Sequence, residues 1–311
     1  MSNILSKIER TTKLVASNSR NVSINYQVID EIIAKGEFDK VSYWLASNPY
    51  GLLDMSCREI VNFLLIYHTI GDYCFWGDPK WTIKTDEGIE LDGSMAMMYL
   101  IIKRYKEEKS FEMSMLTFST WLDGNVEIPL LKERYDCLCE LNRYLKSLKS
   151  DFYDEIKDFK EDISLLDYII NHFSYFDDES IYNGDKVYFY KRAQLLTSDI
   201  LHVREIVEKV KVDYSHLVGC ADYKIPQVMR NLGMLEYSDE LAKLVDNKVN
   251  LKYGSEMEVE IRANDLVVID YIAKKLNNKV SRMDINDYIW LLGQNKRKND
   301  KPYHRTLTIY Y

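Results

Sequence analysis

The stretch SEMEVEIRANDLVVIDYIAKKL, which runs from Ser255 to Leu276, decides the fold class predicted for this chain. Its apolar residues recur at the spacing of an α-helix, and the segment is long enough for several turns. Glu258 follows Ser255 at the spacing of a capping box. Arg262 lies one helical turn after Glu258, so the simplest account of this pair is an ion pair on the helix surface. We therefore expect one long helix with a defined N-terminus.

The same helical spacing continues through most of the sequence. Ser56 and Glu59 form another predicted capping box, and Gly36 is placed to end an earlier helix. The predicted helices cover residues 27–36, 56–70, 94–108, 130–148, 163–173, 192–210 and 255–276. The pattern predicts a mainly α fold.

Strand signals are few. Residues 80–91, KWTIKTDEGIEL, predict a small hairpin around Glu87 and Gly88. KVYFYKRA, residues 186–193, fits either a short strand or the beginning of a helix, and TLTIYY, residues 306–311, fits either a strand or an extended tail. We expect a minor β component beside the helices.

Composition indicates one compact unit over residues 1–311, with room for two lobes. Only 12 Gly and 5 Pro occur in 311 residues, so little of the chain could serve as a flexible linker. The formal net charge of −8 argues against binding to a nucleic-acid backbone, which needs a broad basic face. A small anionic ligand needs only a few local cations and remains compatible with this charge.

The termini and the cysteines predict a cytoplasmic protein without a membrane segment. The N-terminal residues MSNILSKIERTTKLV are polar and contain no apolar leader. The longest apolar run is interrupted by His68 and Asp72 and is too short to cross a bilayer. The 5 cysteines are an odd number, which favours a reducing compartment.

Common metal and cofactor motifs are absent from the sequence. The 5 histidines are scattered, and Cys137 and Cys139 do not have the spacing of zinc ligands. There is no glycine-rich phosphate loop and no G-x-S-x-G motif. We therefore expect neither a metal nor a cofactor.

Asp222, in HLVGCADYKIPQVMRNLG, is the candidate for chemistry. Pro226 suits the first turn of a helix, and Gly233 suits its end. A capping residue would then fall at Ile225, so the spacing weakens the interpretation of Asp222 as a helix cap. The alternative is a carboxylate that acts on a substrate and stays ionised near helix N–H groups.

Other segments each allow a structural and a functional interpretation. In CFWGDPKW, Phe75 and Trp76 could pin a turn to the core or stack on a base. Lys191 and Arg192 could be solvated charges at a helix end or could meet a phosphate or the catalytic carboxylate. Trp290 lies one helical turn after Asn286, and could face a pocket with it or belong to the core. His304 and Arg305 form either a surface charge pair or an anion clamp.

Taken together, these segments resemble the queuosine salvage family, the queuosine 5'-phosphate N-glycosidases. The order and spacing of the motifs make the resemblance specific, and it runs almost from end to end. The motifs are LVASNSRNVSIN, FW at 75–76, FYKRAQ at 189–194, ADYKIPQV at 221–228, LGMLEYSDEL at 232–241, EVEIRA at 258–263 and HRTLTIYY at 304–311.

The resemblance implies a largely helical fold similar to that of the helix-hairpin-helix DNA glycosylases. It implies hydrolysis of the N-glycosidic bond of queuosine 5'-phosphate, which releases queuine and ribose 5-phosphate so that queuine can return to tRNA modification. The family's catalytic aspartate matches Asp222, and its lysine matches Lys191. The expected partner is a small-molecule substrate rather than a nucleic acid or a membrane.

Further residues are expected to bind this substrate. Lys191 is the first candidate for the 5'-phosphate, with Arg192, Arg262, His304 and Arg305 as further candidates, and Trp76 and Trp290 are candidates for stacking on the base. Asn286 or Asp287 should bind the polar edge of the base or its ammonium arm. The full set of expected substrate contacts is Phe75, Trp76, Cys220, Tyr223, Arg262, Asn286, Asp287, Trp290 and His304.

The match has departures that leave alternatives open. Cys220 stands where many members have Phe, Leu291 where some have an acidic residue, and Leu45 where some have His. A related 7-deazaguanine nucleotide or the unphosphorylated nucleoside is therefore an alternative substrate. A non-catalytic protein that binds such a ligand and a nucleic-acid base-excision module are the alternative functions.

Overall fold

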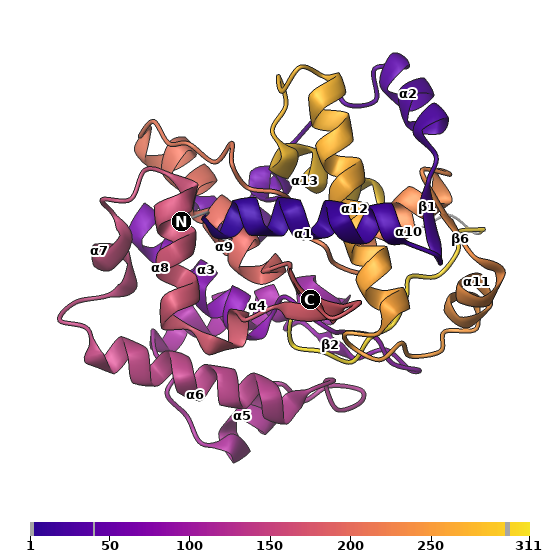
Figure 1. The fold of residues 1–311 in the computed structure, drawn as a ribbon. Helices are drawn as coiled ribbons and strands as arrows, with labels where there is room; N and C mark the ends of the chain where they lie inside the picture. The colour runs from indigo at the N-terminus through magenta and orange to yellow at the C-terminus, as the bar shows by residue number, and fades with distance from the viewer. Residues whose placement is uncertain (1–2, 40, 296–298) are drawn as a thin grey trace. The chain divides into compact units, whose positions relative to one another are not determined.

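A computed structural model describes residues 3–39, 41–295 and 299–311, and helices dominate it (Figure 1). The expected mainly α fold with minor β hairpins is confirmed. The chain divides into two compact units. Unit 1 is built from Met1–Ser47, Asp178–Ser198 and Asp213–Leu307, and unit 2 from Asn48–Asp177, Asp199–Val212 and Thr308–Tyr311.

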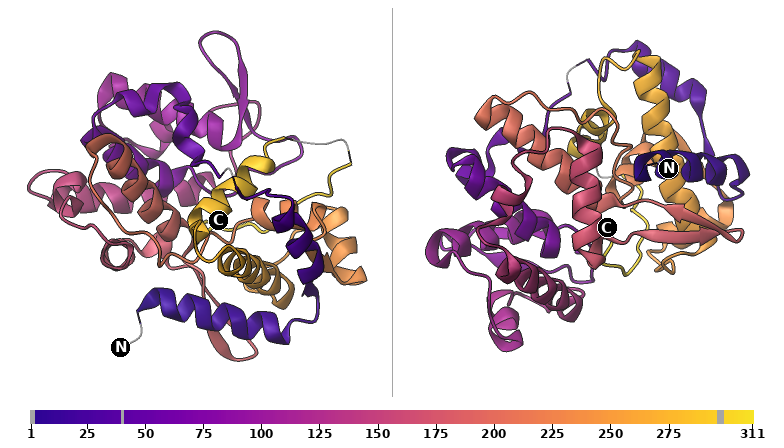
Figure 2. Two further views of the ribbon diagram at one scale, coloured as in Figure 1. Left: turned by 90° about the horizontal axis from the view of Figure 1, so that it is seen from above. Right: turned by 60° about the vertical axis from the view of Figure 1, so that its left-hand side comes forward.

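Unit 1 is organised around the long helix predicted from the sequence. This helix, α12 (Glu256–Lys275), packs against α1 (Ile4–Asn18), and Figures 1 and 2 show the two helices side by side. The remaining elements of unit 1 are β1 Val22–Ile24, α2 Tyr26–Ala34, η1 Trp44–Ser47, β4 Glu179–Tyr182, β5 Asp185–Tyr188, α9 Lys191–Val203, α10 Lys224–Asn231, β6 Leu235–Tyr237, α11 Asp239–Asp246 and α13 Arg282–Leu292. Helix α9 begins in unit 1 and ends in unit 2.

Two details predicted for α12 are wrong. The Ser255 side chain makes no capping hydrogen bond, and the Glu258 side chain accepts the backbone N–H of Gly254 at 3.0 Å. Glu258 and Arg262 do pair at 3.4 Å, but both side chains are fully buried rather than on the surface. Helix α12 is covered by α1, β1, α10 and α13, so charged residues that would usually face water must find partners inside the protein.

A buried glutamate of α12 also holds the N-terminal segment. Glu260 accepts the backbone N–H groups of Arg20 and Asn21 at 3.0 and 2.7 Å and the hydroxyl of Tyr182 at 2.8 Å. Strand β1, which follows directly, pairs antiparallel with β6. These contacts anchor the N-terminal residues on the core helix of unit 1.

The segment 186–193 contains both the end of a strand and the beginning of a helix, the two structures that its sequence allowed. Strands β4 and β5 form a hairpin whose turn residues, Asn183 and Gly184, have φ angles of 51° and 89°. Positive φ at both positions is the requirement of the tightest hairpin turns. Strand β5 ends at Tyr188, and α9 begins at Lys191.

Unit 2 is built around α3 (Cys57–Ile70), which packs against α4 (Gly93–Glu108), α6 (Leu131–Ser147) and α7 (Phe152–Ile156). The capping box of Ser56 and Glu59 is present. The predicted hairpin is formed by β2 and β3. The other elements are η2 Pro49–Asp54, β2 Thr82–Lys84, β3 Glu90–Asp92, α5 Met115–Trp121, α8 Asp162–His172, η3 Ser174–Phe176 and the π-helix η4 Arg204–Glu208.

The last residues of the chain are extended rather than a strand. No strand is assigned over 307–311, and the Tyr311 carbonyl accepts the backbone N–H of Cys74 at 3.2 Å. Tyr311 is fully buried in unit 2. Of the two interpretations of TLTIYY, the extended tail is the correct one.

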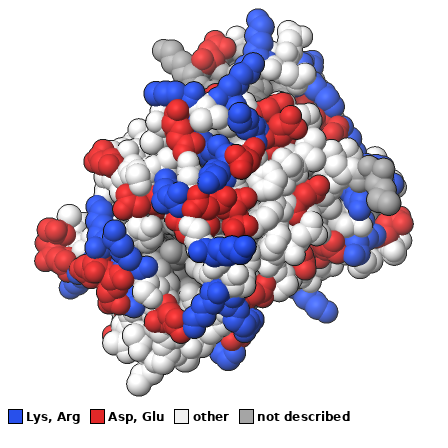
Figure 3. Space-filling view, turned by 90° about the vertical axis from the view of Figure 1, so that its left-hand side faces the viewer, with Lys and Arg blue, Asp and Glu red and all other residues white. Residues whose placement is uncertain are grey.

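The described surface carries charges of both signs, and the cysteines form no disulfides. In Figure 3, Lys and Arg side chains alternate with Asp and Glu on the face that is drawn. None of the helices described is long and apolar enough to cross a membrane. All five cysteines are free thiols, and Cys57, Cys74, Cys137 and Cys220 are buried.

Candidate active site

Asp222 caps helix α10, which corrects the prediction from spacing. The helix begins at Lys224, two residues before Pro226, and not at Pro226 itself. Asp222 Oδ1 accepts the backbone N–H groups of Lys224 at 2.7 Å and Ile225 at 2.8 Å. Pro226 still lies in the first turn, where the N–H that it lacks would have no partner within the helix.

Capping places two backbone donors on one oxygen of this carboxylate. The Asp222 side chain is buried, with 7% of the residue exposed, and its oxygen faces two backbone donors at the positive end of a helix. Hydrogen bonds from donors to an anion, together with the helix dipole, stabilise the negative charge. The two interpretations of Asp222 are therefore compatible, because a helix cap can also present a fixed negative charge to a substrate.

The segment before Asp222 is held by three buried side chains. Gln194 Oε1 accepts the backbone N–H of Val218 at 2.8 Å. Asn286 Oδ1 accepts the N–H of Cys220 at 3.0 Å. Arg262 Nε donates to the carbonyl of Ala221 at 3.0 Å. Because these contacts satisfy successive backbone groups, the segment has little freedom to move independently of α9, α12 and α13.

Gly219, in the same segment, has a backbone conformation and surroundings that require glycine. Its φ angle is +130°, and an added Cβ would come within 3.1 Å of Leu266 and Ile269 on α12. The segment thus lies directly against the core helix.

Lys191 and Arg192 are buried, so of their two interpretations, that of solvated charges at a helix end is wrong for both. Lys191 is 3% exposed and Arg192 is 1% exposed. The backbone N–H of Lys191 donates to Asp178 Oδ2 at 3.1 Å, and its carbonyl accepts the Cys220 thiol at 3.6 Å. The structure therefore brings the backbone of Lys191 against the segment that carries Asp222.

Arg262 forms a buried salt bridge in the same region. Its Nη1 and Nη2 donate to the two oxygens of Asp178 at 2.9 and 2.5 Å. The guanidinium also lies over the ring of Phe189, 4.0 Å from the ring centroid. Such a planar, bidentate contact is the geometry that arginine provides and lysine does not.

His304 is buried near this arginine. Burial and the charge of Arg262 lower the pKa of His304 to about 3. The imidazole is therefore neutral near pH 7 and would meet a phosphate as a hydrogen-bonding group rather than as a cation. The alternative of a surface charge pair with Arg305 is wrong for His304, which is 1% exposed.

The other predicted binding residues occupy different places in the fold. Asn286 contacts Cys220 as described, while Asp287 Oδ2 accepts the backbone N–H of Trp44 at 3.3 Å. Trp290 packs edge to face on Trp44, with 5.9 Å between the ring centroids.

Tyr223, directly after Asp222, packs against Tyr303 with 4.9 Å between the ring centroids. Phe75 and Trp76 belong to unit 2, where both are buried. Phe75 stacks on Trp81 with 6.2 Å between the ring centroids and lies beneath the guanidinium of Arg134. Their role in stacking on a base stays a prediction.

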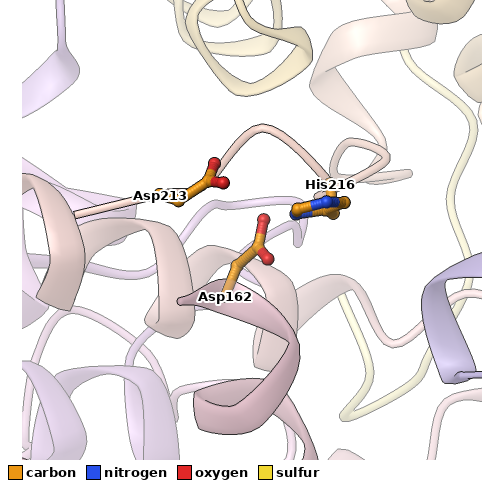
Figure 4. A group of neighbouring side chains, drawn as sticks. All are labelled: Asp162, Asp213 and His216. Atoms are coloured by element: carbon orange, nitrogen blue, oxygen red, sulfur yellow. The ribbon is translucent and has the colours of Figure 1, made fainter. Parts of the chain in front are cut away.

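An exposed loop of unit 1 carries an acidic side chain and an imidazole. Asp213 and His216 lie in the segment between η4 and α10, and Figure 4 shows both side chains there. Asp213 Oδ1 accepts the backbone N–H of Ser215 at 2.9 Å. This is the local bond with which aspartate commonly stabilises a turn, so the loop needs no ligand to explain it.

Sequence reasoning did not single out two residues that organise this region, Asp178 and Gln194. Gln194 is the last residue of the FYKRAQ motif and could have been found there. Asp178 lies in the acidic run FDDES, residues 176–180, where no periodicity distinguishes one carboxylate from the next. Only the fold reveals that Asp178 is buried and bonded to Arg262 and Lys191.

Comparison with known proteins shows the family to which this helical chain belongs. The chain belongs to the family described as queuosine salvage protein, whose model matches residues 53–311.

Several relatives of this chain share one name. The chain is 32% identical to the queuosine 5'-phosphate N-glycosylase/hydrolase of Sphaerobacter thermophilus over 267 residues, which cover 82% of each chain. It is 26% identical to the protein of that name from Dictyostelium discoideum, with 99% of this chain and 100% of the relative covered. It is 28% identical to the Nematostella vectensis protein, with both chains covered completely.

Proposed function

We propose that this chain is a hydrolase that cleaves the N-glycosidic bond of queuosine 5'-phosphate and releases queuine and ribose 5-phosphate. The name shared by relatives that match over most or all of their length supports this activity. The structural observation that carries it is the buried carboxylate of Asp222, held by two backbone N–H groups at the start of α10.

The chemistry of the reaction suits this carboxylate. Breaking the bond between the ribose and the base builds positive charge on the sugar, and a fixed anion stabilises that charge in a site of low dielectric constant. Asp222 would also orient or deprotonate the attacking water. Position 7 of a 7-deaza base is carbon and cannot be protonated there, so the reaction depends more strongly on stabilisation of the sugar.

Lys191 is the better candidate for the 5'-phosphate among the predicted cations. Arg262 is engaged with Asp178, Glu258 and the Ala221 carbonyl. The lowered pKa of His304 makes it neutral near pH 7. Lys191 is buried and its carbonyl accepts the Cys220 thiol, so a phosphate bound near the segment of Asp222 would lie close to this cationic residue.

Both units would serve this one activity as a single domain over residues 1–311. The family model covers residues of both units, which supports this proposal. The product queuine is used in tRNA modification, and free thiols suit a reducing compartment, so we propose a cytoplasmic location. The partner is then a small molecule and not a nucleic acid.

The direct test is to incubate the purified protein with queuosine 5'-phosphate and to detect free queuine by liquid chromatography and mass spectrometry. Asp222→Asn should lower kcat by at least about 100-fold, because it removes the charge that stabilises the transition state. Asparagine caps helices as well as aspartate does, so the fold should persist.

Asp246→Asn is the matched control for this experiment. Asp246 bonds Arg230, a residue of α10 near its other end, and should be dispensable for turnover. Full activity of Asp222→Asn would refute the mechanism. Tight binding of queuosine 5'-phosphate by the wild type without release of queuine would favour a carrier protein instead.

A further inference from the structure

Asp178 bonds the backbone of Lys191 and the arginine that holds the residue before Asp222. The residue is 1% exposed and lies just before β4. Its Oδ2 accepts the backbone N–H of Lys191, the first residue of α9. Its two oxygens also accept both terminal nitrogens of Arg262, whose Nε donates to the carbonyl of Ala221, directly before Asp222. The carboxylate of Asp178 thus bonds the backbone of Lys191 directly, and it reaches Ala221 through Arg262, by one salt bridge and one hydrogen bond.

The backbone around these contacts needs such support. Tyr190, directly before α9, has a φ angle of 51°, a left-handed conformation that costs free energy for a residue with a Cβ. The carbonyl of Asp178 accepts the N–H groups of Phe189 and Tyr190 at 3.0 and 3.3 Å. The backbone and the side chain of Asp178 therefore both hold the turn that precedes Lys191, the first residue of α9.

The segments of Lys191 and Asp222 also contact each other directly. The Cys220 thiol lies 3.6 Å from the carbonyl of Lys191. Movement of either segment would separate this pair, because Cys220 is itself held by Asn286. We propose that Asp178 is a positioning residue that fixes Lys191 and Asp222 relative to each other through its salt bridge with Arg262. The expected effect on kcat rests on the proposed function. The expected movement of the segment that carries Cys220 does not.

The test compares Asp178→Asn with Glu260→Gln. Both changes neutralise a buried carboxylate that holds backbone N–H groups in unit 1, and Glu260 lies on α12 as Arg262 does. Glu260, however, bonds the backbone of Arg20 and Asn21 and the hydroxyl of Tyr182, whereas Asp178 bonds Lys191 and Arg262. The control therefore accounts for a general loss of stability. Circular dichroism defines a temperature at which all variants are folded.

Two readouts are taken at that temperature. In Asp178→Asn, kcat for release of queuine should fall by about 100-fold with a much smaller change in KM, as expected when catalytic groups are misplaced by about 1 Å. The rate at which iodoacetamide labels Cys220 under native conditions, followed by peptide mass spectrometry, should rise. Glu260→Gln should keep the wild-type kcat and the wild-type labelling of Cys220.

The inference stands only if both readouts change in Asp178→Asn and neither changes in Glu260→Gln. If the wild type releases no queuine, the proposed function fails, and the labelling of Cys220 alone decides the inference. If Asp178→Asn does not fold, Asp178→Glu and Arg262→Lys replace it, because they keep the charges and alter only the geometry. Wild-type kcat and wild-type labelling in these folded variants would overturn the inference.

Discussion

His68 lies between two carboxylates inside unit 2. Its Nδ1 is 3.0 Å from Asp72 Oδ2, and its Nε2 is 2.8 Å from Asp199 Oδ2. Burial alone would lower the pKa of His68, but the hydrogen bonds and charges of Asp199 and Asp72 raise it above its usual value. The imidazolium form is therefore favoured in the folded protein.

The raised pKa of His68 predicts a stability that depends on pH. Its contribution is fully present below the unfolded pKa of about 6.5 and is lost as pH rises through the folded pKa. Urea unfolding of the wild type should therefore give a free energy of unfolding that declines above about pH 6.5. His68→Gln should remove this decline, although it lowers stability overall. Parallel pH curves for the two proteins would show that His68 does not titrate as expected.

Asp265 shows the opposite case, a buried carboxyl whose neutral form is favoured. Both of its oxygens are buried, and neither has a hydrogen-bond partner among the residues that the structure describes. Burial and the charge of Asp222 hold the pKa of Asp265 well above its usual range. The folded protein therefore binds this proton more tightly than the unfolded chain does.

This raised pKa predicts that Asp265 costs stability at neutral pH. The free energy of unfolding should fall as pH rises above about 4, and the fall should continue until the folded pKa is reached. Asp265→Asn removes the titrating group, so the variant should gain stability relative to the wild type between pH 4 and pH 7. Thermal melts at several pH values check this, and a constant difference in Tm across that range would contradict it.

At the scale of elements, two serines at helix starts make a matched pair. Ser56 accepts the N–H of Glu59 and forms the complete capping box of α3, whereas Ser255 begins α12 without a capping bond from its side chain. Ser56→Ala should lower the free energy of unfolding by about 1 kcal/mol. Ser255→Ala should cost less, and equal losses in chemical denaturation would mean that the capping bond of Ser56 contributes nothing.

The sequence predicted most helices because their periodicity is local. It failed where a distant partner decides the outcome. The spacing of Ser255 and Glu258 predicted a capping box, but the Glu258 carboxylate accepts hydrogen bonds from Arg262 and from the backbone N–H of Gly254. Pro226 suggested where α10 begins, yet the helix begins earlier, because Asp222 satisfies the first N–H groups.

The candidate site was predictable to a similar extent. Asp222 and Lys191 were identified through their motifs, and both are buried in unit 1 with their segments in contact. Asp178 was not, because its role depends on contacts with Arg262 and Lys191, which are distant in sequence. No motif in a single sequence encodes such a partnership.

At the scale of the whole molecule, the sequence left room for two lobes, but the boundaries of the two units could not have been predicted. A linker rich in glycine or proline would mark a boundary, but the chain passes between units within ordered segments, including helix α9. The low content of Gly and Pro predicts few linkers. It did not indicate that each unit draws on three separate segments.

This interleaving of segments has an evolutionary consequence. Since neither unit is one uninterrupted stretch of chain, no single recombination event could transfer one of them intact to another gene. A duplicated or shuffled fragment would carry an incomplete unit or parts of both, and a break within Lys191–Val203 would divide helix α9. The pair is therefore inherited together, and its descendants should diversify by substitution rather than by exchange of modules.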